Sequence, residues 1–124
     1  MRESLFRSGA FRLHAGEEAD WKIECDVLTP DDWRTLASVA ARLLPPFSTV
    51  EGVPTGGLVF AMTLRLHARP GGGLLIADDV LTTGASMEAV RNGREANGVV
   101  AFARGRCPLW ILPLWRLNLD GLSG

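Results

Sequence analysis

Apolar and polar residues alternate along two short segments near the start of the chain, from Gly9 to Gly16 and from Trp21 to Cys25. A period of two is typical of strands that have one covered face. A polar, acidic turn separates the two segments. The pattern therefore predicts an antiparallel hairpin over about residues 8–26.

The spacing of apolar residues changes to three and four between Trp33 and Leu44, which predicts a helix with one face packed inward. Thr29 suits the N-cap and Pro30 the first helical position, and the prolines at 45–46 end the helix. The acids at 31–32 are interpreted as part of this helix start and not as catalytic groups.

The rest of the chain alternates short apolar segments with helical ones. We expect mostly parallel strands and two further helices. The strands are expected near 47–51, 74–78, 98–103 and 109–112, and the helices over 58–66 and 88–97. The predicted fold class is α/β, a mostly parallel sheet flanked by helices, with the N-terminal hairpin as a small hood.

We expect a single domain over residues 1–124, with a hood at about 8–26, a core at about 29–112 and an apolar C-terminal tail at 113–124. Pro113 argues against a central strand at that point, so the tail is expected to cover the core or a partner subunit. Asn97-Gly98 is expected to close the last helix with a left-handed cap.

Composition excludes several classes of function. The net charge is −1 and no block of Lys or Arg occurs, so nucleic-acid binding is not expected. No apolar run approaches the roughly 20 residues of a membrane helix, and no signal peptide is recognised, so we expect a soluble, cytoplasmic protein. Cys25 and Cys107 lack metal-ligand spacing, so zinc is set aside and both are expected to be reduced and buried.

The stretch from Leu74 to Met87 carries the strongest chemical signal. Asp78 and Asp79 come at the end of an apolar strand, where open α/β sheets bind ligands. Two adjacent acids can accept hydrogen bonds from a vicinal diol, or hold Mg²⁺ directly or through its water. A turn rich in hydroxyls and backbone N–H groups follows at a helix start and suits a phosphate. Its residues are Thr82, Thr83, Gly84, Ala85 and Ser86.

Together these features predict a site for a phosphorylated ribose. The simpler alternative is that the acids cap a turn and the hydroxyl residues merely start a helix. A second glycine-rich loop, at 52–57, follows an earlier strand and precedes an apolar helix. Its backbone can approach an anion closely. Two such loops at one sheet edge suit a substrate with both a phosphate and a diphosphate, whereas the alternative for the second loop is an ordinary glycine turn.

The stretch 74–86 resembles the phosphoribosyl pyrophosphate (PRPP) signature of type I phosphoribosyltransferases, and 52–57 resembles their pyrophosphate loop. The resemblance implies that Asp78 and Asp79 contact the ribose, and that 82–86 binds the 5′-phosphate. It implies a pyrophosphate site formed by Val53, Pro54, Thr55, Gly56 and Gly57. It also implies Mg²⁺ as cofactor, and PRPP with a base or nucleotide as ligands.

The segment 9–16 is similar to the hood of orotate phosphoribosyltransferases, but it has His14-Ala15 where that family has Lys-Ser. The base pocket is therefore expected to differ. His14 could bond a base edge and Trp21 could stack on it, with a surface histidine and a core tryptophan as the alternatives. Arg104, after the 98–103 strand, is a further candidate for a phosphate or base contact, with a solvent-facing turn charge as its alternative.

The family's mobile catalytic hairpin has no counterpart, because only residues 65–73 separate the second helix from the next strand. Arg65, His67 and Arg69 are the cations left there, either as substitutes for that lid or as charges at a helix C-terminus. A neighbouring subunit of a homodimer could instead supply the missing cations.

Three functional hypotheses follow. The first is Mg²⁺-dependent transfer of 5-phosphoribosyl from PRPP to a nitrogenous base, with release of pyrophosphate. A pyrimidine- or orotate-like base is the candidate acceptor. The second is a regulatory module that binds PRPP or a nucleotide without turnover. The third is a purely structural α/β domain, which predicts no ligand affinity.

Overall fold

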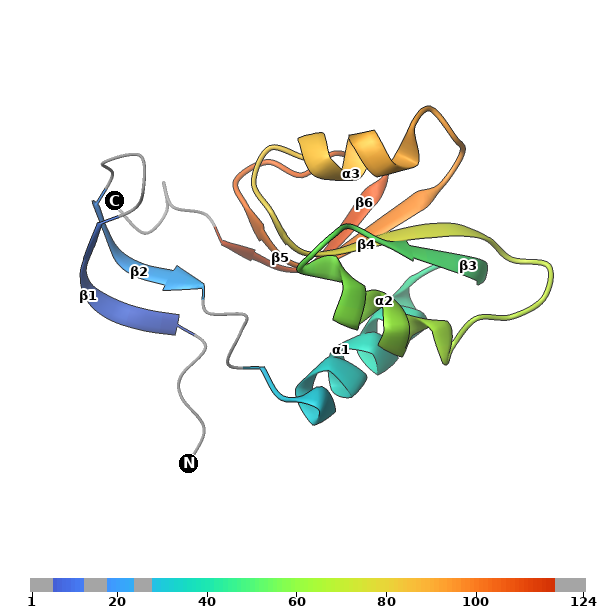
Figure 1. Ribbon diagram of the computed structural model, residues 1–124, viewed down its shortest axis with the longest axis horizontal. Helices are drawn as coiled ribbons and strands as arrows, with labels where there is room; N and C mark the ends of the chain where they lie inside the picture. Colours follow the sequence, from blue (N-terminus) through green and yellow to red (C-terminus); the bar gives the residue numbers. More distant parts are fainter. Residues whose placement is uncertain (1–5, 13–17, 24–27, 118–124) are drawn as a thin grey trace. The chain divides into compact units, whose positions relative to one another are not determined.

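The structure, a computed structural model, describes residues 6–12, 18–23 and 28–117 (Figure 1). The chain divides into two units, Met1–Asp32 and Trp33–Gly124. In the first unit β1 (Phe6–Arg12) pairs antiparallel with β2 (Glu18–Ile23), which confirms the predicted hairpin. The organisation as a single domain stays a prediction.

Helix α1 (Pro30–Leu43) begins where the sequence places it. The Thr29 hydroxyl accepts a hydrogen bond from the Asp32 N–H at 3.1 Å, and the Asp32 carboxylate accepts one from the Thr29 N–H at 2.8 Å. This is a reciprocal capping box in which an aspartate takes the place of the usual Glu or Gln. The assignment of Asp32 to capping is therefore confirmed.

Replacing Thr29 by Ala should lower the free energy of unfolding by about 1 kcal/mol, because the Asp32 N–H loses its partner at the helix start. Denaturant unfolding would measure the loss. Thr29→Ser keeps the hydroxyl and is the matched control, expected near the wild type. An equal loss in both variants, or no loss in Thr29→Ala, would contradict a stabilising role of the Thr29 hydroxyl.

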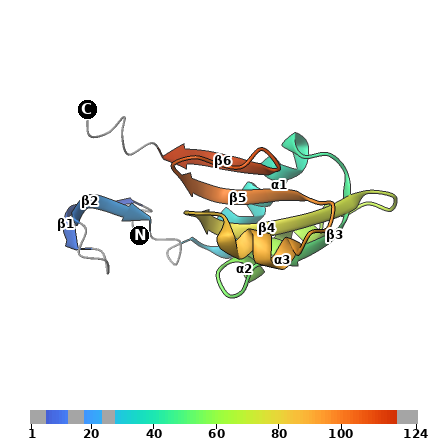
Figure 2. The ribbon, with the colours of Figure 1, turned by 90° about the horizontal axis from the view of Figure 1, so that it is seen from above.

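The second unit is built on a four-stranded parallel sheet in the order β3-β4-β5-β6, as Figure 2 shows from above. The strands are β3 (Phe47–Gly52), β4 (Gly73–Leu81), β5 (Asn97–Arg104) and β6 (Ile111–Leu117). Helices α1 and α2 (Gly57–Arg65) lie on one side of the sheet and α3 (Ala85–Arg91) lies on the other (Figure 1). The predicted α/β class is confirmed.

The central strands form the core. Six consecutive residues of β5, from Gly98 to Ala103, are buried, as expected for a strand covered on both faces. On one side the ring of Trp33 in α1 contacts that of Phe60 in α2, with centroids 5.2 Å apart. On the other side Met87 of α3 belongs to a cluster with Ile76 and other buried residues. Because β4 pairs parallel with β3 and β5, its carboxyl end lies at the same edge of the sheet as theirs.

Three element boundaries differ from prediction. Strand β4 continues to Leu81 because it stays paired with β5 after β3 has ended. Helix α3 begins three residues earlier than expected and ends at Arg91, because Asn92 and then Gly93 adopt left-handed φ values of 52° and 75°. The expected cap at Asn97-Gly98 is therefore wrong, and these residues begin β5.

The third difference concerns the end of the chain. Residues 113–117, predicted as tail, belong to β6, in which Pro113 lies opposite Val100. Proline is tolerated because β6 is an edge strand, with a hydrogen-bonded neighbour on one side only. Trp115 accordingly lies in the sheet, and its ring stacks on Phe102 with centroids 5.5 Å apart.

Two predictions from composition can also be compared with the structure. Cys107 is a free thiol, half-buried and not fully buried, and burial raises its pKa. Cys25 lies outside the described residues. Within the described ranges, no helix combines the length and apolar character that crossing a membrane requires.

Candidate functional site

The glycine loop after β3 packs directly on the acidic end of β4. The Val53 N–H donates to the Ala77 carbonyl at 2.9 Å, which extends the pairing of the two strands into the loop. A Cβ atom placed on Gly57 would lie 2.5 Å from the Ala77 oxygen, and one on Gly56 would lie 2.7 Å from Cγ of Asp79. Glycine is therefore required for the loop to approach the two acids this closely.

Only part of the predicted pyrophosphate loop faces solvent. Residues 54–56 are exposed, whereas Val53 and Gly57 are buried. The Val53 side chain joins the core cluster, and the Gly57 N–H donates to the Val53 carbonyl at 2.8 Å. The Pro54–Thr55 peptide bond is cis. Val53 and Gly57 shape the loop, and the backbone of 54–56 is the part that can meet a ligand.

Asp78 and Asp79 lie in β4, just beyond the point where β3 stops pairing. Asp78 is 8% exposed. Its Oδ1 accepts a hydrogen bond from the Asp79 N–H at 2.8 Å, and Asp79 Oδ1 accepts one from the Val80 N–H at 2.8 Å. The Oδ2 atom of each carboxylate takes no part in these two bonds.

Burial, as the larger cause, and the neighbouring Asp79 carboxylate together raise the pKa of Asp78 to about 7, against the opposing effect of the Asp79 N–H. A buried acid beside a second acid is costly to ionise. A cation, or hydroxyl groups that donate hydrogen bonds, would favour the ionised form. The pair is thus suited to a ligand that brings positive charge or hydrogen-bond donors.

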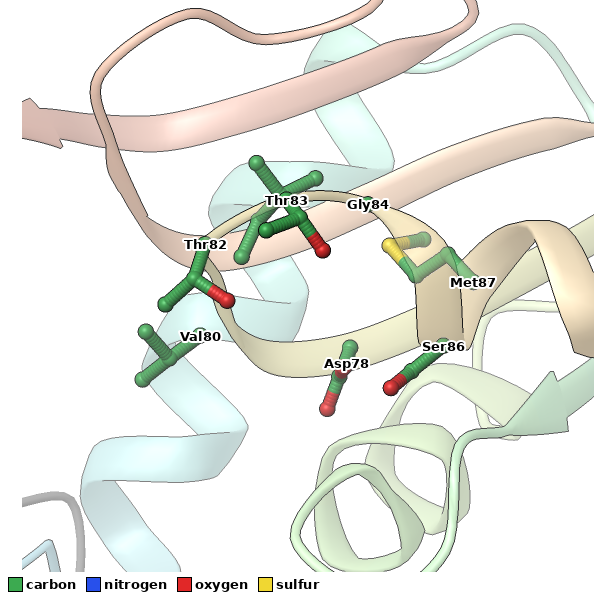
Figure 3. Close-up of a pocket in the computed structure, with 8 residues that line it drawn as sticks. Asp78, Val80, Thr82, Thr83, Gly84, Ser86 and Met87 are labelled. Carbon is green, nitrogen blue, oxygen red and sulfur yellow. The ribbon is translucent and has the colours of Figure 1, made fainter. Parts of the chain in front are cut away.

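The predicted phosphate loop bends around a small open hollow of about 30 Å³. Figure 3 shows the hydroxyls of Thr82 and Thr83 turned toward the inside of the loop, with the Ser86 hydroxyl and the Asp78 carboxylate at its other side. Gly84 has a φ of 88°, which allows the turn into α3. The structure thus brings together the residues assigned to the phosphate, and phosphate binding itself stays a prediction.

The residues present are suited to Mg²⁺ only when a bound ligand supplies further coordinating groups. No cluster of three or more His, Cys, Asp or Glu side chains suited to a metal occurs in the described part of the chain. Mg²⁺, however, usually keeps several waters and binds one or two carboxylates together with substrate phosphates. Asp78 and Asp79 supply that donor set.

The three cations assigned to a missing lid do not lie at this site. Arg65, in the last turn of α2, donates to the Val50 carbonyl from Nε at 3.1 Å and from Nη2 at 2.9 Å. His67 and Arg69 line a different cavity, where β3 begins. The hydrogen bonds of Arg65 and the short turn hold these residues away from the Asp pair of the same subunit, and their role as lid substitutes stays a prediction.

The base-binding candidates belong to different parts of the chain. Arg104 is the last residue of β5, at the carboxyl edge of the sheet, opposite Leu117. Trp21 lies in β2, opposite Ser8, in the first unit. His14 lies outside the described residues. A base site formed by these three residues stays a prediction.

An ion pair that sequence reasoning missed connects β3 with the segment after α3. Arg94 Nη1 and Nη2 donate to the two oxygens of Glu51 at 2.8 and 2.7 Å, and Nη2 also donates to the Val90 carbonyl. The Arg94 hydrogen bond lowers the pKa of Glu51. Glu51 immediately precedes the 52–57 loop, and Arg94 follows α3, so the pair ties together the elements that carry both loops. The two residues are 43 positions apart, and no local pattern signals their contact.

The sequence matches no family model, and no curated protein is significantly similar to it. The structure, however, is similar to three solved orotate phosphoribosyltransferases. That of Aeropyrum pernix matches with a TM-score of 0.71 and 23% identity, over 96% of this chain and 93% of that chain. Those of Francisella tularensis and Mycobacterium tuberculosis H37Rv match with TM-scores of 0.66 and 0.64 and identities of 14% and 19%. They cover 95% and 81% of this chain, and 82% and 77% of their own chains.

This similarity shows the fold. The chain has the type I phosphoribosyltransferase fold, in the form found in the orotate phosphoribosyltransferases. The resemblance drawn from its motifs is confirmed at that level. Between Arg65 and Gly73, only residues 66–72 join α2 to β4, which agrees with the absence of the catalytic hairpin.

Proposed function

We propose that this chain is a phosphoribosyltransferase-like protein that binds PRPP with Mg²⁺. It transfers the 5-phosphoribosyl group to a ring nitrogen of a base and releases pyrophosphate. The observation that carries this proposal is the contact of the glycine loop at 54–57 with Asp79 and with the β4 backbone at Ala77 and Asp78. An acidic pair lies between two candidate anion sites, in the order needed for a sugar with an anion at each end.

Each part of the site has one role in this proposal. The carboxylates of Asp78 and Asp79 accept hydrogen bonds from the ribose hydroxyls and orient the sugar. The loop at 82–86 holds the 5′-phosphate, and the exposed backbone of 54–56 holds the diphosphate. The negative carboxylates also favour the positive charge that develops at the anomeric carbon as the bond to the diphosphate breaks. Mg²⁺, when bound, would offset the charge of the departing diphosphate.

The acceptor is proposed to be a pyrimidine-like base. The solved structures of the same fold are orotate phosphoribosyltransferases. His14-Ala15 replaces the Lys-Ser of the family's hood motif, which favours an acceptor whose contacts differ from those of orotate. A cytoplasmic homodimer, in which a neighbouring subunit supplies cations to the site, completes the proposal.

A second candidate function is a PRPP- or nucleotide-binding regulatory module without turnover. The specific observation in its favour is the short connection at 66–72, together with the use of Arg65 to bind the Val50 carbonyl. Within the described residues, no cation from this connection lies at the Asp pair to stabilise a leaving diphosphate. Pyrophosphate release in the presence of a base distinguishes the two functions.

Calorimetric titration of Mg²⁺ and PRPP into the folded protein should give binding that Asp79→Asn weakens by about 10- to 100-fold. This range corresponds to a lost charge-assisted hydrogen bond of about 1.5–3 kcal/mol. Glu95→Gln removes one negative charge from an exposed position after α3 and is the matched control, expected to bind as the wild type does.

The same samples should then be screened for pyrophosphate release over a series of free bases. Release with one base supports the transferase, and binding without release supports the regulatory module. Absence of binding to the folded wild type would overturn both functions.

A further inference from the structure

A second cavity, of about 210 Å³, lies at the opposite end of the sheet from the Asp pair. Strand β3 begins beside this cavity with Phe47 and ends beside the candidate site with Gly52. The lining residues come from the end of α1, the start of β3 and the turn between α2 and β4. They are Ala41, Leu44, Pro45, Pro46, Phe47, His67 and Arg69.

The backbone around this cavity is held by hydrogen bonds between segments far apart in the sequence. The Arg69 N–H donates to the Phe47 carbonyl at 2.7 Å, and the Gly73 N–H donates to the Pro46 carbonyl at 3.2 Å. The Ser48 hydroxyl donates to the Gly72 carbonyl at 2.8 Å. The cavity is therefore preformed, and a ligand would not have to order its walls.

The lining combines an apolar wall with positive charge. Five of the seven lining residues are alanine, leucine, proline or phenylalanine, while His67 and Arg69 both come from the 66–72 turn. No acidic residue lines this cavity. Among the residues that the structure describes, neither the His67 nor the Arg69 side chain makes a hydrogen bond or an ion pair, so both can receive an anionic group.

The size of the cavity limits the ligand. An apolar cavity of about 150 Å³ can hold a benzene ring. A volume of 210 Å³ therefore admits one six-membered ring with a single small substituent, but not a nucleotide. A guanidinium at the wall favours a planar carboxylate, which it can bind through two parallel hydrogen bonds.

We propose that this cavity is a binding site for a small aromatic carboxylate. The ring lies against Leu44, Pro45 and Pro46, and the carboxylate meets Arg69 and His67. The proposal does not depend on the proposed transferase function, because the two sites share no residue.

Benzoate is the probe, and ¹H–¹⁵N NMR titration of the full chain is the measurement. Amide signals of Leu44, Phe47 and the 66–69 segment should shift with saturation below about 10 mM, and benzamide, which has the same shape without the charge, should bind at least about tenfold more weakly. The double variant His67→Gln/Arg69→Gln should bind benzoate at least about tenfold more weakly than the wild type. Arg106→Gln, which removes an exposed charge outside the cavity lining, is the control.

Ala41→Leu provides a variant of another kind, because it fills the cavity without changing charge and should also abolish binding. Each variant is first compared with the wild type by thermal unfolding and by titration with Mg²⁺ and PRPP, so that loss of fold or of the other site is recognised. Equal binding of benzoate and benzamide would overturn the proposal, as would benzoate binding that both variants leave unchanged, or no shift in the folded wild type.

Discussion

Replacing Gly57 by Ala should destabilise the second unit by about 3 kcal/mol, at the upper end of the usual cost of overpacking. The new Cβ would lie 2.5 Å from the Ala77 oxygen and 3.0 Å from the Asp78 Cα. Both are backbone atoms of a central strand, so they cannot rotate away as a side chain could. Thermal unfolding should show a midpoint lower by about 10 °C or more.

Two other glycines serve as comparisons for this variant. Gly73→Ala places its Cβ in open space, and its stability should stay close to that of the wild type. Gly56→Ala meets the Asp79 carboxylate, which is the end of a side chain and can move. Gly56→Ala should therefore lose affinity for Mg²⁺ and PRPP. Its loss of stability should be less than half that of Gly57→Ala. If Gly57→Ala were as stable as Gly73→Ala, the loop would not lie against β4 as described.

The second large effect concerns the pH dependence of stability. The pKa of Asp78 is about 7 in the folded chain, whereas that of an unperturbed Asp is 3.8. Between these values the folded state binds more protons than the unfolded state, so the free energy of unfolding should fall as pH rises. Three pKa units correspond to about 4 kcal/mol, which is an upper limit for the stability lost by pH 8.

Asp78→Asn has nearly the same size and cannot ionise, so it should remove this contribution. We expect the variant to resemble the wild type in stability near pH 4 and to exceed it by about 2–4 kcal/mol near pH 8. Urea unfolding of both proteins across this pH range measures the difference between their free energies of unfolding. The titration of other groups contributes equally to both proteins and cancels in this difference. A difference that does not change with pH would contradict the burial of an ionisable Asp78.

The same substitution should weaken binding of Mg²⁺ and PRPP, because Asn cannot offer a carboxylate to a cation. A gain in stability combined with a loss of affinity is the usual pattern at binding sites, where charged groups are held in unfavourable surroundings. In this chain the unfavourable surroundings are those of Asp78 itself. Asp78 is 8% exposed and lies beside a second acid.

The sequence predicted the elements whose signals are local. Continuous apolar runs identified β4 and β5, and the run at 33–44 with its capping residues identified α1 at the correct start. The glycines at 56–57 and the acids at 78–79 were recognised by residue type, although their mutual contact depends on the parallel pairing of β3 and β4.

The predictions that differed from the structure depend on contacts between residues that are distant in the sequence. The length of β4 depends on β5, the strand at Pro113 depends on its place at the sheet edge, and the Glu51–Arg94 pair joins segments with no shared pattern. The position of His67 and Arg69 was missed for the same reason, since the hydrogen bond from Arg69 to Phe47 decides which end of the sheet they occupy.

The bond from Val53 to Ala77 fixes one further property of the candidate site. The 53–57 loop is held at one point of β4, and the 82–86 loop is the direct continuation of the same strand. The distance between the two candidate anion-binding loops is therefore set by a single strand, β4. Under the proposed function, the site would select a ligand by the distance between its two charged ends, and a sugar with one phosphate would reach only one of the two loops.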